Sequence, residues 1–183
     1  MLLPLSFPLR SAFLALPLEG EAVLRFQEVQ KKLVPFEKLF RFQQPDRPHL
    51  TLFYWQSLME IEYEGMVKQL QKIAQKTRPF TLDVTEAGTF SGEKLPRVLF
   101  LGVTRSAELS DLKKRCPWPN LKPFTPHITL SRMKNPQAFL VHRKDIMKAL
   151  KNIFFMVPCD RLRFYADIDG VKQTPIQDFV FKL

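Results

Sequence analysis

Two of the chain's three histidines lie in the same five-residue context: Pro48-His49-Leu50-Thr51-Leu52 and Pro126-His127-Ile128-Thr129-Leu130. Side chains alternate between the two faces of an extended strand, so each His shares a face with the Thr two residues later, while the apolar residues face a core. Each motif therefore predicts a strand that presents one imidazole and one hydroxyl. Two such strands across a cleft would surround one ligand with two of each group.

An imidazole has a pKa of about 6.5, so it takes or gives a proton near neutral pH. Two imidazoles on opposite sides of a phosphorus atom can serve as base and acid in one in-line displacement, without a metal ion or another cofactor. The hydroxyls of Thr51 and Thr129 would donate hydrogen bonds to the non-bridging phosphate oxygens. The pattern thus predicts acid and base catalysis on a phosphate ester by His49 and His127.

A single His-x-Thr on an amphipathic strand is ordinary surface, but its repetition in one context has no packing reason and indicates function. The third histidine, His142, lacks this context and is expected to be a solvated residue near a helix start. Arg132 follows His127 by five residues and is the expected charge partner of the phosphate. Strict alternation would place Arg132 on the opposite face, so the strand must twist, bulge or end near Ser131; otherwise Arg132 is a plain surface residue.

Metal binding is the main rival use of the two histidines. A zinc site takes three or four ligands at recognisable spacings, and neither motif contains a His-x-His, His-x3-His or Cys-x2-Cys pattern. We therefore expect no metal. A serine-type triad lacks a nucleophile elbow, and there is no glycine-rich phosphate loop, so side chains must hold the phosphate.

The chain has 183 residues with 45% hydrophobic and 25% charged residues, which is typical of a folded protein. Its net charge of +10 indicates an anionic partner, nucleic acid before membrane. Two cysteines, Cys116 and Cys159, make no disulfide framework, which favours a reducing cytoplasm. No segment predicts a membrane span, and a monomer is expected. Residues 1–10 are expected to be an irregular N-terminal extension, and residues 11–183 one domain.

Apolar runs and amphipathic segments alternate along the chain and predict an α+β fold. Expected strands span residues 11–18, 49–55, 80–90, 97–103, 127–133, 154–166 and 176–181, and expected helices span 19–34, 62–76, 106–115 and 143–152. Ser106 is the expected N-cap of the third helix. The order of strand, helix, His strand, helix and strands occurs twice, which indicates a duplication centred on the two motifs.

The paired motifs resemble the 2H phosphoesterase superfamily and, within it, the RNA 2′,3′-cyclic phosphodiesterases, also called 2′-5′ RNA ligases. The resemblance runs from about residue 11 to the C-terminus. It rests on the two His motifs, the second within Phe124-Thr125-Pro126-His127-Ile128-Thr129-Leu130-Ser131-Arg132, on Phe13-Leu14-Ala15-Leu16-Pro17-Leu18, and on Leu95-Pro96-Arg97-Val98-Leu99-Phe100-Leu101-Gly102-Val103.

This resemblance implies a bilobal fold with two pseudo-symmetric lobes of mainly antiparallel sheet, outer helices and a central cleft. The implied reaction opens a terminal 2′,3′-cyclic phosphate of RNA to a 2′-phosphomonoester, with weak reverse 2′-5′ ligation. His127 would activate the water and His49 would protonate the departing O3′. Thr51, Thr129 and Arg132 would hold the phosphate, although the near symmetry of the two motifs leaves open which imidazole is the base.

The chain departs from the family pattern after the first motif, where it has Phe53-Tyr54-Trp55-Gln56. By alternation Phe53 and Trp55 share the face of His49, and an unpaired base could stack on them. The other interpretation is that both are core residues. Two alternative functions also stay open: cleavage of a small cyclic nucleotide or ADP-ribose cyclic phosphate, and non-catalytic binding of nucleotide or RNA.

Overall fold

The computed structural model describes residues 5–91, 95–119 and 123–182. The elements follow the order β1 (Leu9–Pro17), α1 (Glu21–Lys31), the 3-10 helix η1 (Val34–Leu39), β2 (Phe40–Phe42), β3 (His49–Leu58), α2 (Glu60–Gln75), β4 (Phe80–Ser91), β5 (Pro96–Val103), α3 (Ala107–Arg115), β6 (His127–Met133), α4 (Pro136–Ala149), β7 (Phe155–Cys159), β8 (Arg161–Ile168) and β9 (Val171–Val180). None of the helices among these residues is long and apolar enough to cross a membrane.

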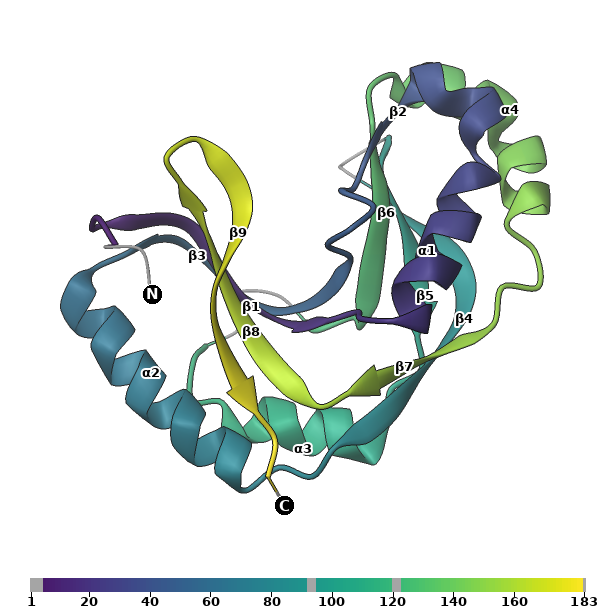
Figure 1. Ribbon diagram of the computed structural model, residues 1–183. Coiled ribbons are helices and arrows are strands. Elements are labelled where there is room, and N and C mark those ends of the chain that lie inside the picture. Colours follow the sequence, from purple (N-terminus) through teal and green to yellow (C-terminus); the bar gives the residue numbers. More distant parts are fainter. Residues whose placement is uncertain (1–4, 92–94, 120–122, 183) are drawn as a thin grey trace.

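The strands form one sheet in the order β7-β4-β5-β6-β3-β1-β8-β9, with β2 added to β6. The two motif strands, β3 and β6, are neighbours at its centre, and their register is defined by the single pair Leu50 and Ile128. Four strands therefore lie on each side: a first arm of β3, β1, β8 and β9, and a second arm of β6, β5, β4 and β7. The arms curl away from this seam (Figure 1), which confirms the expected α+β fold of two antiparallel lobes.

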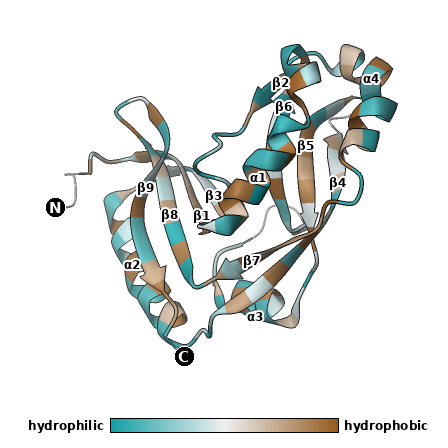
Figure 2. Cartoon of the chain, turned by 45° about the vertical axis from the view of Figure 1, so that its right-hand side comes forward, coloured by the Kyte–Doolittle hydropathy of each residue, from teal (hydrophilic) through white to brown (hydrophobic). Residues whose placement is uncertain are grey.

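The helices cover the arms with apolar faces. In α1 the buried residues are Ala22, Phe26, Val29 and Gln30, and brown and teal residues share this helix in Figure 2, as expected of a helix with one buried face. Residues of both arms and of all four α-helices join in one buried apolar cluster. Ser106 caps α3, since its side chain accepts a hydrogen bond from the Leu109 N–H, as predicted.

Several predicted boundaries are wrong. Strand β1 begins at Leu9, which pairs with Leu58, so residues 9 and 10 belong to the sheet and not to an irregular extension. Helix α4 begins at Pro136, after the N-cap Asn135, and not at residue 143; His142 therefore lies in the middle of a helix. The short β2 and η1 were not expected.

The strand expected over residues 154–166 is two strands, β7 and β8, separated at Asp160. The break has a topological cause, because β7 pairs with β4 in the second arm and β8 pairs with β1 in the first. The chain thus crosses from the second arm to the first at Asp160.

Candidate active site

The two His-x-Thr motifs lie side by side at the centre of the sheet. His49, Thr51 and Thr129 line a cavity of about 370 Å³. His127 does not line this cavity but lies on the same strand as Thr129, two residues away. Its charge nevertheless acts on His49, whose protonated form it disfavours. The structure therefore brings the four predicted motif residues together.

Both motif strands carry a β-bulge at the same position. Along β1 and β3, Ala15 pairs with Thr51 but the preceding residue pairs with Phe53, so Leu52 is the extra residue. In the pair of β5 and β6, Leu99 pairs with Ser131 and the next residue, Phe100, pairs with Thr129. Leu130 is therefore the extra residue. Each bulge falls three residues after the histidine. A bulge reverses the alternation of faces beyond it.

The bulge in β6 brings Arg132 to the cavity, which it lines. This confirms the prediction that the strand must depart from regular alternation near Ser131. The bulge in β3 brings Tyr54, the equivalent fifth residue after its histidine, to the same cavity. Sequence analysis missed Tyr54. The equal spacing of Tyr54 and Arg132 from their histidines was the available signal.

The same bulge overturns the expected placement of Phe53 and Trp55 on the cleft face. Phe53 is only 4% exposed and belongs to the core, and Trp55 packs against Trp118 and Phe164. Tyr54, between them, is 58% exposed. The aromatic ring available to a ligand from this segment is therefore that of Tyr54.

Side chains from two helices hold the carbonyl groups of the bulge residues. The Gln30 side-chain amide on α1 donates to the Leu130 carbonyl at 3.2 Å. The Lys113 ammonium on α3 donates to the Leu52 carbonyl and lies 3.2 Å from the centroid of the Phe53 ring. Burial lowers the pKa of Lys113 to about 8. Helix α1, which follows β1 of the first arm, thus holds the bulge in β6 of the second arm. Helix α3, which follows β5 of the second arm, holds the bulge in β3 of the first arm.

Backbone carbonyls orient both catalytic candidates in the same way. His49 Nδ1 lies 2.9 Å from the Arg47 carbonyl oxygen, and His127 Nδ1 lies 2.8 Å from that of Thr125. Because a carbonyl oxygen only accepts, each Nδ1 donates its hydrogen. Nε2 of each ring is left to take or give a proton.

Aromatic rings enclose both imidazoles. His49 stacks on Phe13 with 4.8 Å between ring centroids, and His127 meets Phe90 edge-on at 4.7 Å. Burial lowers the pKa of His49 to about 4, an effect increased by the charge of His127, and burial also lowers the pKa of His127. Both rings are therefore neutral at pH 7 in the free protein, and a bound anion would favour their protonation.

The depressed pKa of His49 should make folding pH-dependent. The unfolded chain binds a proton at this residue below about pH 6.5, whereas the folded chain does so only near pH 4. The free energy of unfolding is expected to fall by roughly 3 kcal/mol as the pH falls through this window. Urea unfolding at pH 7 and pH 4.5 measures the change, with His49→Gln as the comparison. An equal pH dependence in both proteins would contradict the assignment.

One hydrogen bond joins the two arms over the cavity. Gln43, which follows β2, donates from its side chain to the side chain of Gln173 on β9 at 2.6 Å, and both residues line the cavity. Ser11, Asp167 and Lys172 complete the lining from the first arm. Among residues 5–91, 95–119 and 123–182, no three His, Cys, Asp or Glu side chains are grouped so that they could hold a metal ion.

Two antiparallel arms that each present a His-x-Thr strand to one cleft define a recognisable class of phosphoesterase fold. The model of the 2′-5′ RNA ligase superfamily matches residues 20–170, more than half of the chain. The chain belongs to this superfamily, which confirms the resemblance.

Curated relatives named RNA 2′,3′-cyclic phosphodiesterase include a protein of Aquifex aeolicus, 32% identical over 115 residues that make up 57% of this chain and 61% of the relative. A protein of the same name from Methanothermobacter thermautotrophicus is 26% identical over 137 residues, 69% of this chain and 72% of the relative. The chain thus spans less than two thirds of the Aquifex protein.

Solved structures confirm the fold. The protein TT0787 of Thermus thermophilus has a TM-score of 0.73 and 24% identity, over 94% of this chain and 98% of that one. LigT of E. coli in the apo form has a TM-score of 0.70 and 22% identity, over 97% of this chain and all of that one (100%).

Proposed function

We propose that the chain hydrolyses the terminal 2′,3′-cyclic phosphate of RNA to a 2′-phosphomonoester, without a metal ion. The observation that carries the proposal is the pair of imidazoles, each with Nδ1 fixed by a carbonyl and Nε2 free, beside two Thr hydroxyls on one face. The names of the curated relatives support it, as does the solved complex of E. coli LigT with 3′-AMP.

In this reaction a water oxygen attacks phosphorus in line with the bond from phosphorus to O3′. One imidazole takes a proton from the water while the other gives a proton to O3′ as that bond breaks. The products are a 2′-phosphomonoester and a 3′-hydroxyl. Thr51 and Thr129 donate hydrogen bonds to the non-bridging oxygens, and Arg132 offsets their charge. With a 5′-hydroxyl in place of the water, the same proton transfers would join two RNA ends in a weak, reversible 2′-5′ ligation.

Two divisions of the acid and base roles between the histidines are considered. The family resemblance implies His127 as the base and His49 as the acid. Burial lowers the pKa of both imidazoles, to about 4 for His49, so the neutral form of His49 is available as a base in the free protein and the opposite division is also tested below. In either division, kcat/KM requires one neutral and one protonated imidazole. Because both pKa values are lowered from 6.5, kcat/KM should already be declining as the pH rises through 6.5.

The reaction is tested with a short RNA that ends in a 2′,3′-cyclic phosphate, incubated with the protein in EDTA, with 2′- and 3′-phosphate products resolved by chromatography. We expect turnover to the 2′-phosphate product alone, because the acid and base act on opposite sides of one P–O3′ bond. A mixture of both products, or activity that disappears in EDTA and returns with zinc, would contradict the metal-free His pair.

A further inference from the structure

Two arginines lie directly opposite each other at the rim of the cavity. In the antiparallel pair of β2 and β6, Arg41 is the register partner of Arg132. Directly opposed residues share one face of a sheet. Because Arg132 lines the cavity, Arg41 lies on the same side, and Gln43, two residues beyond Arg41, also lines the cavity, as alternation requires.

This arrangement is unfavourable without an anion. Like charges directly opposite one another destabilise a strand pair. Within the described part of the chain, neither Arg41 nor Arg132 makes an ion pair with an acidic side chain. Both residues are exposed, and β2 is only three residues long with no strand described on its other side.

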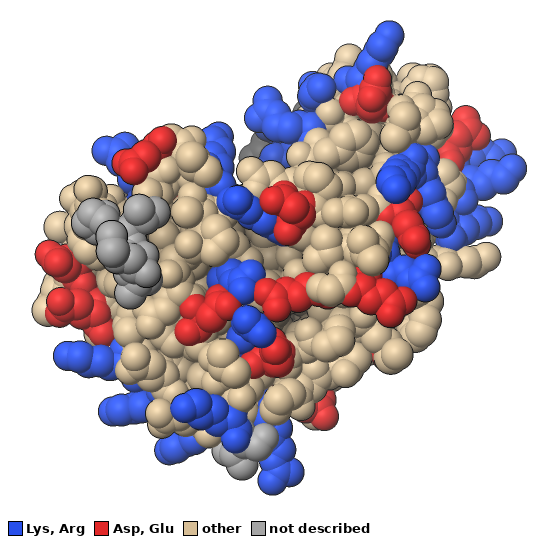
Figure 3. All heavy atoms as spheres, in the orientation of Figure 1, with Lys and Arg blue, Asp and Glu red and all other residues tan. Residues whose placement is uncertain are grey.

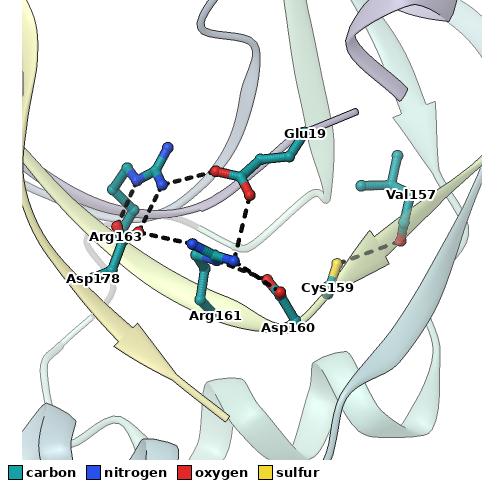
Figure 4. Close-up of polar contacts among 7 residues, drawn as sticks. All are labelled: Glu19, Val157, Cys159, Asp160, Arg161, Arg163 and Asp178. Atoms are coloured by element: carbon teal, nitrogen blue, oxygen red, sulfur yellow. Dashed lines mark hydrogen bonds and ion pairs between the residues drawn. The ribbon is translucent and has the colours of Figure 1, made fainter. Parts of the chain in front are cut away.

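Two other arginines on one strand face of this protein are neutralised by carboxylates, unlike Arg41 and Arg132. Arg161 and Arg163 also share one face of a strand, but Asp178 on β9 accepts from both guanidinium groups, and Glu19 lies 2.7 Å from Arg163 (Figure 4). Acidic and basic side chains are correspondingly mixed in a band across the middle of the molecule (Figure 3). The pair at the cavity rim has no such neutralisation among the described residues.

We infer that Arg41, beside Arg132, forms a second anion site, which binds the phosphate that links the terminal nucleotide of the substrate to the rest of the RNA chain. The inference rests on the proposed function, in which the reacting phosphate contacts the His-x-Thr strands and Arg132. Arg41 lies one strand further from the His-x-Thr motifs than Arg132, so a second phosphate of the ligand is the anion that it would bind. An oligonucleotide carries the second phosphate, whereas a cyclic mononucleotide does not. The site therefore selects RNA over a small cyclic phosphate.

The test compares Arg41→Gln with the unchanged protein on two substrates, a 2′,3′-cyclic mononucleotide and a trinucleotide with the same cyclic end. We expect the ratio of kcat/KM for the trinucleotide to that for the mononucleotide to fall about fivefold, as for the loss of one exposed ion pair at the strong end of its usual range. The slope of log kcat/KM against log salt concentration for the trinucleotide should become less negative by about 0.7, the value for one phosphate of a single strand.

Lys72→Gln is the matched control, because it removes the same charge from an exposed position on α2, at the far side of the first arm (Figure 1). This variant should keep the substrate ratio and the salt slope. An unchanged ratio and slope in Arg41→Gln would overturn the second anion site. If the unchanged protein turns over neither substrate, the proposed function fails, and equilibrium binding of the trinucleotide 2′-phosphate to both proteins still decides the site.

Discussion

Replacing either His49 or His127 by alanine is expected to lower kcat on RNA with a 2′,3′-cyclic phosphate end by about 10²- to 10⁴-fold, the range for loss of one positioned proton carrier. Each variant removes the imidazole that transfers a proton on one side of the phosphorus atom. The remaining imidazole lies on the other side and cannot replace it. Single-turnover rates measured with saturating enzyme separate this loss from any change in substrate affinity.

The leaving group distinguishes the two histidines. A substrate whose leaving group is a weakly basic phenolate does not need a proton to depart, so the variant that lacks the acid should recover most of its rate on such an ester, and the variant that lacks the base should not. Recovery in His127→Ala would assign His49 as the base and His127 as the acid. His142→Ala, which changes an exposed residue in the middle of α4, is the control. A near-normal rate in either His49→Ala or His127→Ala would end the acid and base proposal.

Arg132→Met should lower kcat on the same RNA by about 10²-fold or more, comparable to removal of one group that stabilises developing charge on an oxyanion. The guanidinium reaches the cavity only because of the bulge at Leu130, and it is the cation among the cavity-lining residues of the second arm. Methionine keeps much of the apolar stem and removes the charge. Steady-state kinetics at low ionic strength measures the effect.

Arg97→Met provides the matched control for this loss. Arg97 is exposed on β5 beside Val98, the register partner of Arg132, but is absent from the cavity lining. The control should retain activity and report any general effect of losing one positive charge near β6. Equal activity losses in the two variants would show that Arg132 acts through net charge and not through contact with the phosphate.

The local pattern predicted the motif strands well, because both the type and the order of His, Thr and apolar residues are repeated. Strand β6 has the predicted bounds, and the four motif residues share a face. The faces of Phe53 and Trp55 were mistaken because alternation assumes that pairing is regular. The bulge in β3 is fixed by pairing with β1 and by Lys113 on a helix distant in sequence. Neither contact can be predicted from the residues of the five-residue motif.

The remaining errors also come from contacts distant in sequence. Pro158 and the charged Asp160 and Arg161 mark the boundary between β7 and β8 only weakly, because the separation reflects pairing with strands of different arms. Pro136 at the start of α4 was compatible with a helix, but the predicted helix began only at residue 143. The 3-10 helix and β2 span residues 34–42, which contain one proline and three phenylalanines, and β2 forms because β6 offers a free edge.

The contacts of Gln30 with the bulge in β6 and of Lys113 with the bulge in β3 each join the two halves of the chain. Each half of the sequence supplies the helix that contacts the bulge in the motif strand of the other half. Each half also supplies strands to the other arm: β2 and β4 from the first half pair within the second arm, and β8 and β9 from the second half pair within the first arm. The two arms are thus related as the subunits of a homodimer with swapped elements are, within one polypeptide. Neither half is a module that could be transplanted by itself, because its own histidine would lack the backbone geometry that only the other half imposes.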